Sequence, residues 1–188
     1  MANLYTVEKE IKGKKILAQF NGISAALQAM DSSYIEGTNN TSIEKLAKYL
    51  FANVIVEPKM NIDEFGADKI GKEEKKTING VEYVARFGGL SVALKAIDSS
   101  YIDGTSHVST EKLAKYLFDK VIVKPEKLTP DDFDSMEDFN EVISFAREVM
   151  QGGDVMEEFN EIVSFAREVM QGNFRAKNTD KKPNQAKG

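Results

Sequence analysis

The sequence of 188 residues contains no cysteine and only one histidine, His107. The absence of cysteine excludes disulfides, thiolate nucleophiles and zinc–thiolate sites, and it is compatible with a reducing compartment. An excess of basic residues is also missing, because 25 Lys and Arg face 30 Asp and Glu, which disfavours nucleic acid as the main ligand. No apolar run approaches the roughly 20 residues that span a bilayer, and the polar start does not resemble a secretory signal. We therefore expect a cytoplasmic protein.

What is present is a core-forming composition and a long internal repeat. Hydrophobic residues make up 41% of the chain and the net charge is −5, as in a soluble globular protein. Residues 31–51 (DSSYIEGTNNTSIEKLAKYLF) return as residues 98–118 (DSSYIDGTSHVSTEKLAKYLF), and the copies continue in step through VIVEP and VIVKP. Because self-similarity of this length decides the architecture, we predict a duplicated small domain.

The end of the chain indicates that one copy is inserted into the other. Two near-identical helical segments, residues 135–152 and 155–172, lie end to end, whereas the first copy lacks a closing helix after residue 65. Removing residues 69–153 restores one uninterrupted copy. The predicted domains are a first copy of residues 1–68 plus 154–175, an inserted second copy of residues 69–153, and a disordered tail of residues 176–188.

Two alternatives to this nested order stay open. In a plain tandem with exchanged helices, residues 135–152 would pack on the first copy instead of on their own. The duplication could also be natural or the result of engineering, and the repeat by itself does not distinguish these origins.

Each copy is predicted to be α+β, a β-hairpin followed by three helices. The hairpin turns lie at residues 12–14 and at Asn79-Gly80, and the second is a strong hairpin signal. The first helix has apolar residues at helical spacing, among them Ile23 and Leu27. The Val-Ile-Val runs at residues 54–56 and 121–123 are expected to be extended but not paired centrally, since a proline follows each of them.

The later helices carry sequence signals for their starts. Thr41 with Glu44 can form a capping box for the second helix of the first copy. The closing helix is expected to be capped by Asp154 in the first copy and by Ser135 in the second.

The closing helix of the first copy has a wide apolar arc, which suggests more than one contact surface. A helix that only covers its own hairpin needs an apolar stripe of about 100°. In one interpretation the arc packs in the core and against its twin helix, through an antiparallel turn at residues 151–155. In the other it forms a groove for a protein partner. The candidate partner-binding residues are Met156, Phe159, Val163, Met170, Phe174 and Arg175.

Catalytic, metal and cofactor sites are not indicated. His107 is replaced by Asn40 in the other copy, which argues against a general base. The acidic run at residues 131–138 lacks the glycine and the ligand alternation of a calcium loop, and carboxylates suit a helix start. Gly88-Gly89 is explained by a tight turn. We predict no cofactor, no metal and no enzymatic activity.

The order of the hairpin, FNGISAALQAMDSSY, EKLAKYLF, VIVEP and FNEIVSFAREVMQGNFR resembles the small tail assembly chaperones of long-tailed phages and prophages of Gram-positive bacteria. The resemblance covers nearly all of both copies, although such proteins typically have one domain. It implies a non-enzymatic role in the host cytoplasm: coating the tape measure protein, recruiting tail tube subunits, and leaving before the virion is finished. No catalytic or ligand-binding residues come with the family.

The expected partners are therefore proteins, with no nucleic acid and no membrane, and homo-oligomerisation stays open. The alternative function is an adaptor or inhibitor, carried on a mobile element, that binds a host protein. Whether a longer frameshifted product exists is also left open by the sequence.

Overall fold

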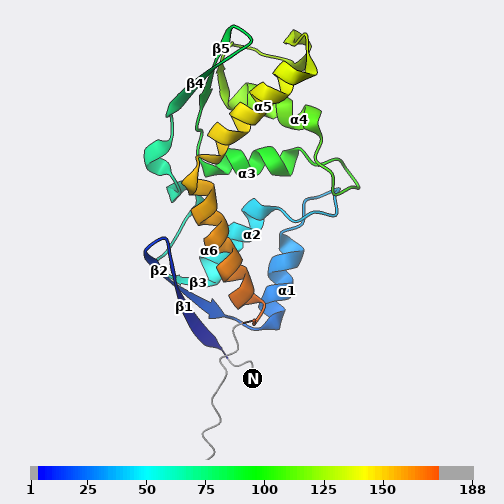
Figure 1. Cartoon of the computed structure of the whole chain (residues 1–188). Coiled ribbons are helices and arrows are strands. Elements are labelled where there is room, and N and C mark those ends of the chain that lie inside the picture. The colour runs from blue at the N-terminus through cyan, green and yellow to red at the C-terminus, as the bar shows by residue number, and fades with distance from the viewer. Residues whose placement is uncertain (1–3, 174–188) are drawn as a thin grey trace, which may run out of the picture.

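The computed structural model describes residues 4–173, in which two three-stranded sheets and six α-helices confirm the expected α+β class (Figure 1). The strands are β1 (Tyr5–Ile11), β2 (Lys14–Phe20), β3 (Ile55–Glu57), β4 (Glu73–Ile78), β5 (Val81–Arg86) and β6 (Ile122–Lys124). The helices are α1 (Ile23–Ser32), α2 (Ile43–Asn53), α3 (Leu90–Ser99), α4 (Thr110–Lys120), α5 (Met136–Gln151) and α6 (Asp154–Met170). Short 3-10 helices are η1 (Ile62–Glu64), η2 (Ala67–Lys69) and η3 (Pro130–Asp132).

Each sheet begins with a hairpin whose turn is set by local chemistry. The strand pairing leaves Lys12-Gly13 and Asn79-Gly80 as two-residue turns, and all four residues have positive φ. Two-residue turns of this backbone type match the right-handed twist of the strands, and glycine and asparagine tolerate them best. The predicted hairpins are confirmed.

A third strand in each sheet was not expected. β3 pairs antiparallel with β2, and β6 pairs with β5, so the second strand of each hairpin is central. Pro58 and Pro125 follow the last residue of these strands and lie beyond the pairing. Ile55 of β3 is completely buried. β3 is an edge strand, so the lack of a backbone N–H at the proline that follows it costs no hydrogen bond in the sheet.

The helix caps differ in part from those predicted. Ser42, not Thr41, caps α2, because its hydroxyl accepts the backbone N–H of Lys45. Ser135 caps α5 as expected. Asp154 does not cap α6: it is the first helical residue, and its carboxylate binds the Lys69 ammonium instead.

The two closing helices pack on different sheets. α6 contacts β1, β2 and α2, whereas α5 contacts β4, β5, α3 and α4, so the helices are not exchanged between sheets (Figure 1). We call β1–β3, α1, α2, η1, η2 and α6 the first unit, and β4–β6, α3, α4, η3 and α5 the second unit. How the gene acquired its second copy stays a prediction.

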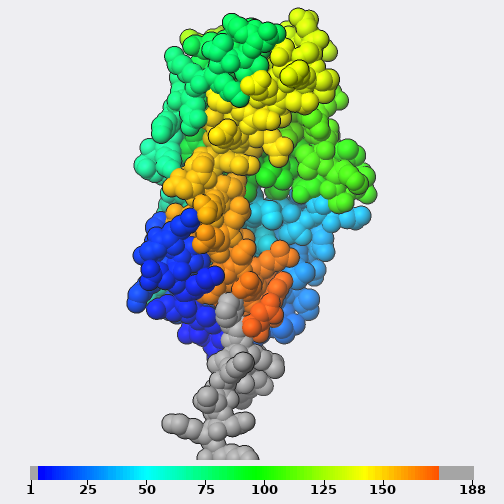
Figure 2. Space-filling view, viewed as in Figure 1, coloured from blue at the N-terminus to red at the C-terminus, as the bar shows by residue number. Residues whose placement is uncertain are grey.

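Each unit has its own hydrophobic core. The first core places α6 between the hairpin and α1–α2, an arrangement visible on the surface in Figure 2. The second core is the equivalent cluster under α5. The first core also includes Phe87, Leu90 and Leu94, which belong to the second unit, so the units share an apolar contact. Among the described residues, no helix is long and apolar enough to cross a membrane.

Candidate protein-binding surfaces

Most of the predicted partner-binding residues of α6 lie inside the first core. Phe159 is fully buried, and Val163 and Met170 are buried as well. Met156 is half-buried and contacts both cores. α6 packs on the sheet and on α2. Its buried side chains therefore cannot contact a partner while the fold is intact. Phe174 and Arg175 lie outside the described residues.

The second contact surface of the closing helices is not the twin helix. α5 and α6 meet end to end at Gly152-Gly153 and run over different sheets instead of forming an antiparallel pair (Figure 1). The wide apolar arc of α6 is used within its own unit, because one side faces the strands and the other faces α2. The core part of that interpretation is confirmed and the paired-helix part is wrong.

The residues considered for chemistry have local structural roles. His107 is exposed, and its backbone N–H is bound by the Thr105 hydroxyl oxygen. The Asp132 carboxylate accepts the hydroxyl and the N–H of Thr129, and the hydroxyl bond in particular lowers the pKa of Asp132. In residues 4–173, no group of three or more His, Asp or Glu is arranged to hold a metal ion.

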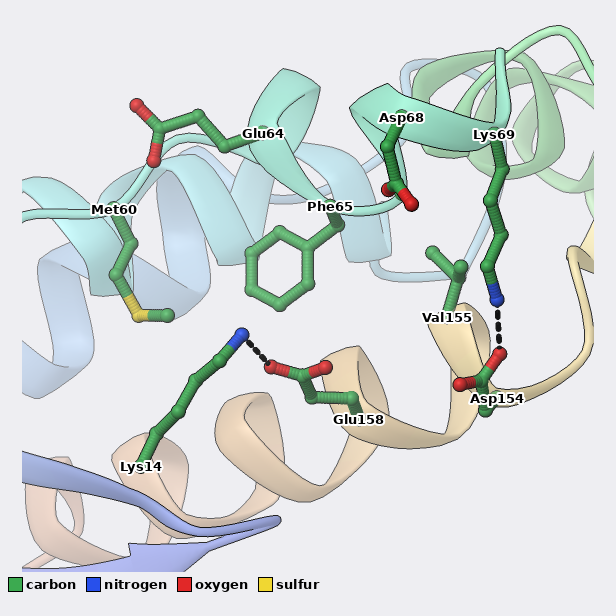
Figure 3. A pocket seen from close by; sticks show the side chains of 10 residues that line it. Lys14, Met60, Glu64, Phe65, Asp68, Lys69, Asp154, Val155 and Glu158 are labelled. Carbon is green, nitrogen blue, oxygen red and sulfur yellow. Dashed lines mark hydrogen bonds and ion pairs between the residues drawn. The ribbon is translucent and has the colours of Figure 1, made fainter.

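A shallow groove of about 310 Å³ lies where the chain leaves the first unit and re-enters it (Figure 3). Lys14 donates to Glu158 at 2.6 Å, and Lys69 pairs with Asp154. The hydrogen bond from Lys69 lowers the pKa of Asp154 and raises that of Lys69. Exposed pairs of this kind contribute little stability. The pair between Lys69 and Asp154 does show that the end of η2 lies next to the start of α6.

The two units meet through an apolar contact between α2 of the first and α3 of the second. Leu90 and Leu94 of α3 are 1% and 2% exposed, because they pack into the first core with η1 and α2. Phe87 also reaches across: a Cβ built on Gly66 would lie 3.3 Å from its ring. In Figure 2 the second unit lies directly on the cyan and blue surface of the first.

Polar groups surround this apolar contact. The Ser42 hydroxyl donates to Asp98, and the Ser91 hydroxyl donates to Asp63 at 2.6 Å. The loops before α2 and α4 are joined directly, since the Gly104 N–H donates to the Gly37 carbonyl at 2.8 Å. Contacts of both kinds fix the second unit in one position on the first.

Asp98 is a half-buried ionisable group of this contact, and Glu44 lies buried near it. Burial raises its pKa above the ordinary value of 3.8, and nearby Glu44 acts in the same direction. The Ser42 hydroxyl and Lys45 oppose the shift. A carboxyl with a raised pKa in the folded state favours the fold when protonated, and this advantage is lost as the pH rises through the folded pKa.

Asp98→Asn is therefore expected to raise the thermal unfolding midpoint at pH 7. Asparagine removes the buried charge and keeps an oxygen that can accept the Ser42 hydroxyl. The difference between wild type and variant should vanish below the ordinary pKa of 3.8, where both side chains are neutral. Thermal unfolding at several pH values measures this. A variant that is less stable at pH 7 would show that the charged form contributes favourably.

Two exposed apolar surfaces were missed by sequence reasoning. On α1, Ile23 and Leu27 are 58% and 56% exposed, although the helix buries Ala26 and Ala29. In the loops before α2 and α4, the side chains of Tyr34, Ile102 and Val108 are exposed. The sequence did contain a signal for the exposed surface of α1. The segment has apolar residues on two sides of the helix, whereas packing on one core requires only one apolar side.

The fold and these surfaces define an α+β protein of two equivalent units with exposed apolar side chains. No known protein family, curated protein or solved structure matches the chain.

Proposed function

We propose that this chain is a non-enzymatic tail assembly chaperone that binds the tape measure protein and tail tube subunits during phage tail morphogenesis. The proposal is supported by the sequence resemblance, which covers nearly all of both copies. The observation that carries it is a continuous edge formed by two equivalent loops, residues 33–42 and 100–109, which we call the loop edge.

The loop edge is built the same way in both units. Each loop closes through an isolated antiparallel bridge, Tyr34 with Thr41 and Tyr101 with Val108. The loops lie side by side because Asn40 Nδ2 donates to the Thr105 carbonyl at 2.7 Å, in addition to the Gly104–Gly37 bond. These hydrogen bonds hold the backbone of both loops, from which the exposed apolar side chains project.

A fixed edge with exposed apolar side chains on both loops suits a long helical partner. Tyr34 is 49% exposed, and Ile102 and Val108 are 43% and 42% exposed, so the two loops offer apolar contacts at a set spacing. A partner helix with a regular apolar stripe can contact both loops at once, and joining two weak contacts in one chain raises the effective concentration of the second. Such binding is strong in sum but reversible at each contact.

Co-expression with the tape measure protein tests the proposal. We expect the two proteins to co-purify, and we expect Ile102→Asp with Val108→Asp to abolish the complex, since two charges would be buried against apolar partner side chains. Val81→Asp is the matched control: Val81 is 44% exposed at a hairpin turn, away from the loop edge, and should leave binding unchanged.

Other outcomes point elsewhere. Capture of a host protein in place of a tail protein would favour the mobile-element adaptor or inhibitor. A complex that survives both loop substitutions would remove the loop edge as the binding surface.

A further inference from the structure

The chain contains two Asn-Gly pairs, residues 21–22 and residues 79–80, and the fold holds them very differently. Glycine has no side chain, so its backbone nitrogen can approach the side-chain amide carbon of the preceding asparagine more closely than in any other pair. Attack of that nitrogen on the amide carbon is the first step of spontaneous deamidation. In a folded protein the reaction requires a local opening of the backbone, so its rate depends on what holds each pair in place.

The first pair, Asn21-Gly22, is held on all sides. Asn21 is half-buried and Gly22 is buried. The Asn21 amide donates to the Asn53 carbonyl at 2.6 Å, and its oxygen accepts the side-chain amide of Gln19 at 2.9 Å. Gly22 precedes α1, and its carbonyl accepts the N–H of Ala26. Several of these contacts must break together before the nitrogen of Gly22 can reach the amide carbon of Asn21.

The second pair, Asn79-Gly80, lies in the open turn of the β4–β5 hairpin. Both residues are exposed, and a Cβ built on Gly80 would meet nothing within 4 Å. The strand pairing ends at Ile78 and Val81 and does not include the turn. Among residues 4–173, the only hydrogen bond of the Asn79 side chain runs from Nδ2 to the Asp138 carboxylate, at 3.0 Å. One exposed hydrogen bond contributes little, so this turn opens far more easily than the backbone at residues 21–22.

The corresponding turn of the first unit shows what the contact of Asn79 does. There Lys12 and Lys14 connect the β1–β2 hairpin to the start of α6, since Lys12 pairs with Glu157 at 3.0 Å and Lys14 pairs with Glu158 at 2.6 Å. Cations on the turn thus meet carboxylates on the closing helix. Lysine does not deamidate, so this connection is chemically permanent.

The second unit makes the same connection with a neutral group. Asn79 occupies the position of Lys12, Val81 occupies that of Lys14, and Asp138 is the counterpart of Glu158. The turn is therefore connected to α5 by the Asn79 amide, while the Lys76–Glu141 pair at 3.0 Å lies further along β4.

We propose that Asn79 is a site of spontaneous deamidation and that the carboxylate it forms frees the β4–β5 turn from α5. The Gly80 nitrogen forms a bond to Cγ of Asn79, the bond from Cγ to Nδ2 breaks, and the Gly80 amide proton leaves with Nδ2 as ammonia. Water then opens the five-membered ring. Cleavage of the new bond at Cγ gives aspartate, and cleavage at the main-chain carbonyl gives isoaspartate. The reaction involves no oxidant and no cofactor, and the inference does not rest on the proposed function.

Both products reverse the contact with α5. A hydrogen-bond donor is replaced by a negative charge opposite Asp138, and two carboxylates at this range repel each other. Isoaspartate also lengthens the backbone of the turn by one carbon atom, which disturbs a two-residue turn. The pairing of β4 with β5 and the Lys76–Glu141 pair stay in place, so the change is confined to the turn.

Peptide mapping by mass spectrometry tests the reaction on the full chain, after incubation in mildly alkaline buffer. Trypsin cleaves after lysine and arginine, so the two pairs fall in different peptides, residues 16–45 and residues 77–86. We expect residues 77–86 to exchange the amide for a carboxyl group several-fold faster than residues 21–22 do in the folded chain. In denaturant, where neither pair is held, the two rates should be similar. Fragment spectra locate the modified residue in each peptide.

Asn79→Gln is the matched chemical control. It keeps an amide, but its ring closure would need six members, so the rapid conversion at residue 79 should be lost. Equal conversion of the two pairs in the folded chain would overturn the proposal. A pair at residues 79–80 that stays intact in the folded chain while the denatured chain reacts would overturn it as well.

Amide hydrogen exchange tests the effect on the turn. Asn79→Asp carries the charge of the product, and the protection of residues 77–82 should fall below that of the wild type. Asn79→Lys restores the cation of the first unit and should leave the protection unchanged or higher; lysine fits the turn, since Lys12 has φ 49° at the equivalent position. Wild-type protection in Asn79→Asp would show that the new charge does not free the turn.

Discussion

Replacing Phe159 by alanine is expected to lower the free energy of unfolding by about 3–5 kcal/mol. The ring is fully buried and meets Phe65 edge-on at 5.5 Å and Phe51 edge-on at 6.0 Å between centroids. Alanine leaves a cavity between α6, α2 and the loop after η1, which these elements cannot close without losing their other contacts. Chemical denaturation monitored by circular dichroism measures the loss.

Two variants serve as controls for this result. Phe139→Ala makes the same change in the second unit, where the ring is 7% exposed and meets Phe133 and Phe118 edge-on, and it should also destabilise strongly. Met136→Ala removes a side chain that is 68% exposed and should stay within about 0.5 kcal/mol of the wild type. A loss below about 1 kcal/mol for Phe159→Ala would show that α6 is not part of the first core.

Deleting residues 69–153 and joining Asp68 to Asp154 is expected to give a shorter chain that still folds. The two ends already lie together, since Lys69 binds Asp154 and a Cβ on Gly66 would lie 2.7 Å from a Val155 methyl. The remaining chain keeps every strand and α-helix of the first unit and loses only Lys69, the last residue of η2. It should be less stable than the full protein because Leu90 and Leu94 no longer cover the first core.

Circular dichroism and thermal unfolding of the shortened chain measure this outcome. A sigmoidal transition with mixed helix and strand content is the expected result. Residues 1–68 alone are the control and should remain unfolded, because removing α6 exposes the face of Ile16 and Phe51 that it covers. If the shortened chain shows no cooperative transition, the first unit depends on the second for its fold.

The candidate site shows where a sequence pattern stops being informative. The wide apolar arc of α6 was compatible with a core position and with a partner groove, since burial by the same chain and burial by a partner need the same residue types. Phe159 and Val163 turn out to be core residues. Ile23 and Leu27 have equally apolar side chains in a shorter helix, yet they are exposed. Periodicity reports that a face is apolar and not which surface covers it.

By itself the sequence determined the features that depend on neighbouring residues: the hairpin turns at Gly13 and Gly80, the Ser135 cap and the α+β class. Backbone conformation and capping are local, so a few adjacent residues suffice to specify them. Only the tertiary structure decided that the Val-Ile-Val runs pair as third strands, and that Leu94 of α3 is covered while the equivalent Leu27 of α1 is exposed. Those outcomes depend on distant surfaces meeting, because the repeated helices are nearly identical and differ only in what the fold places against them.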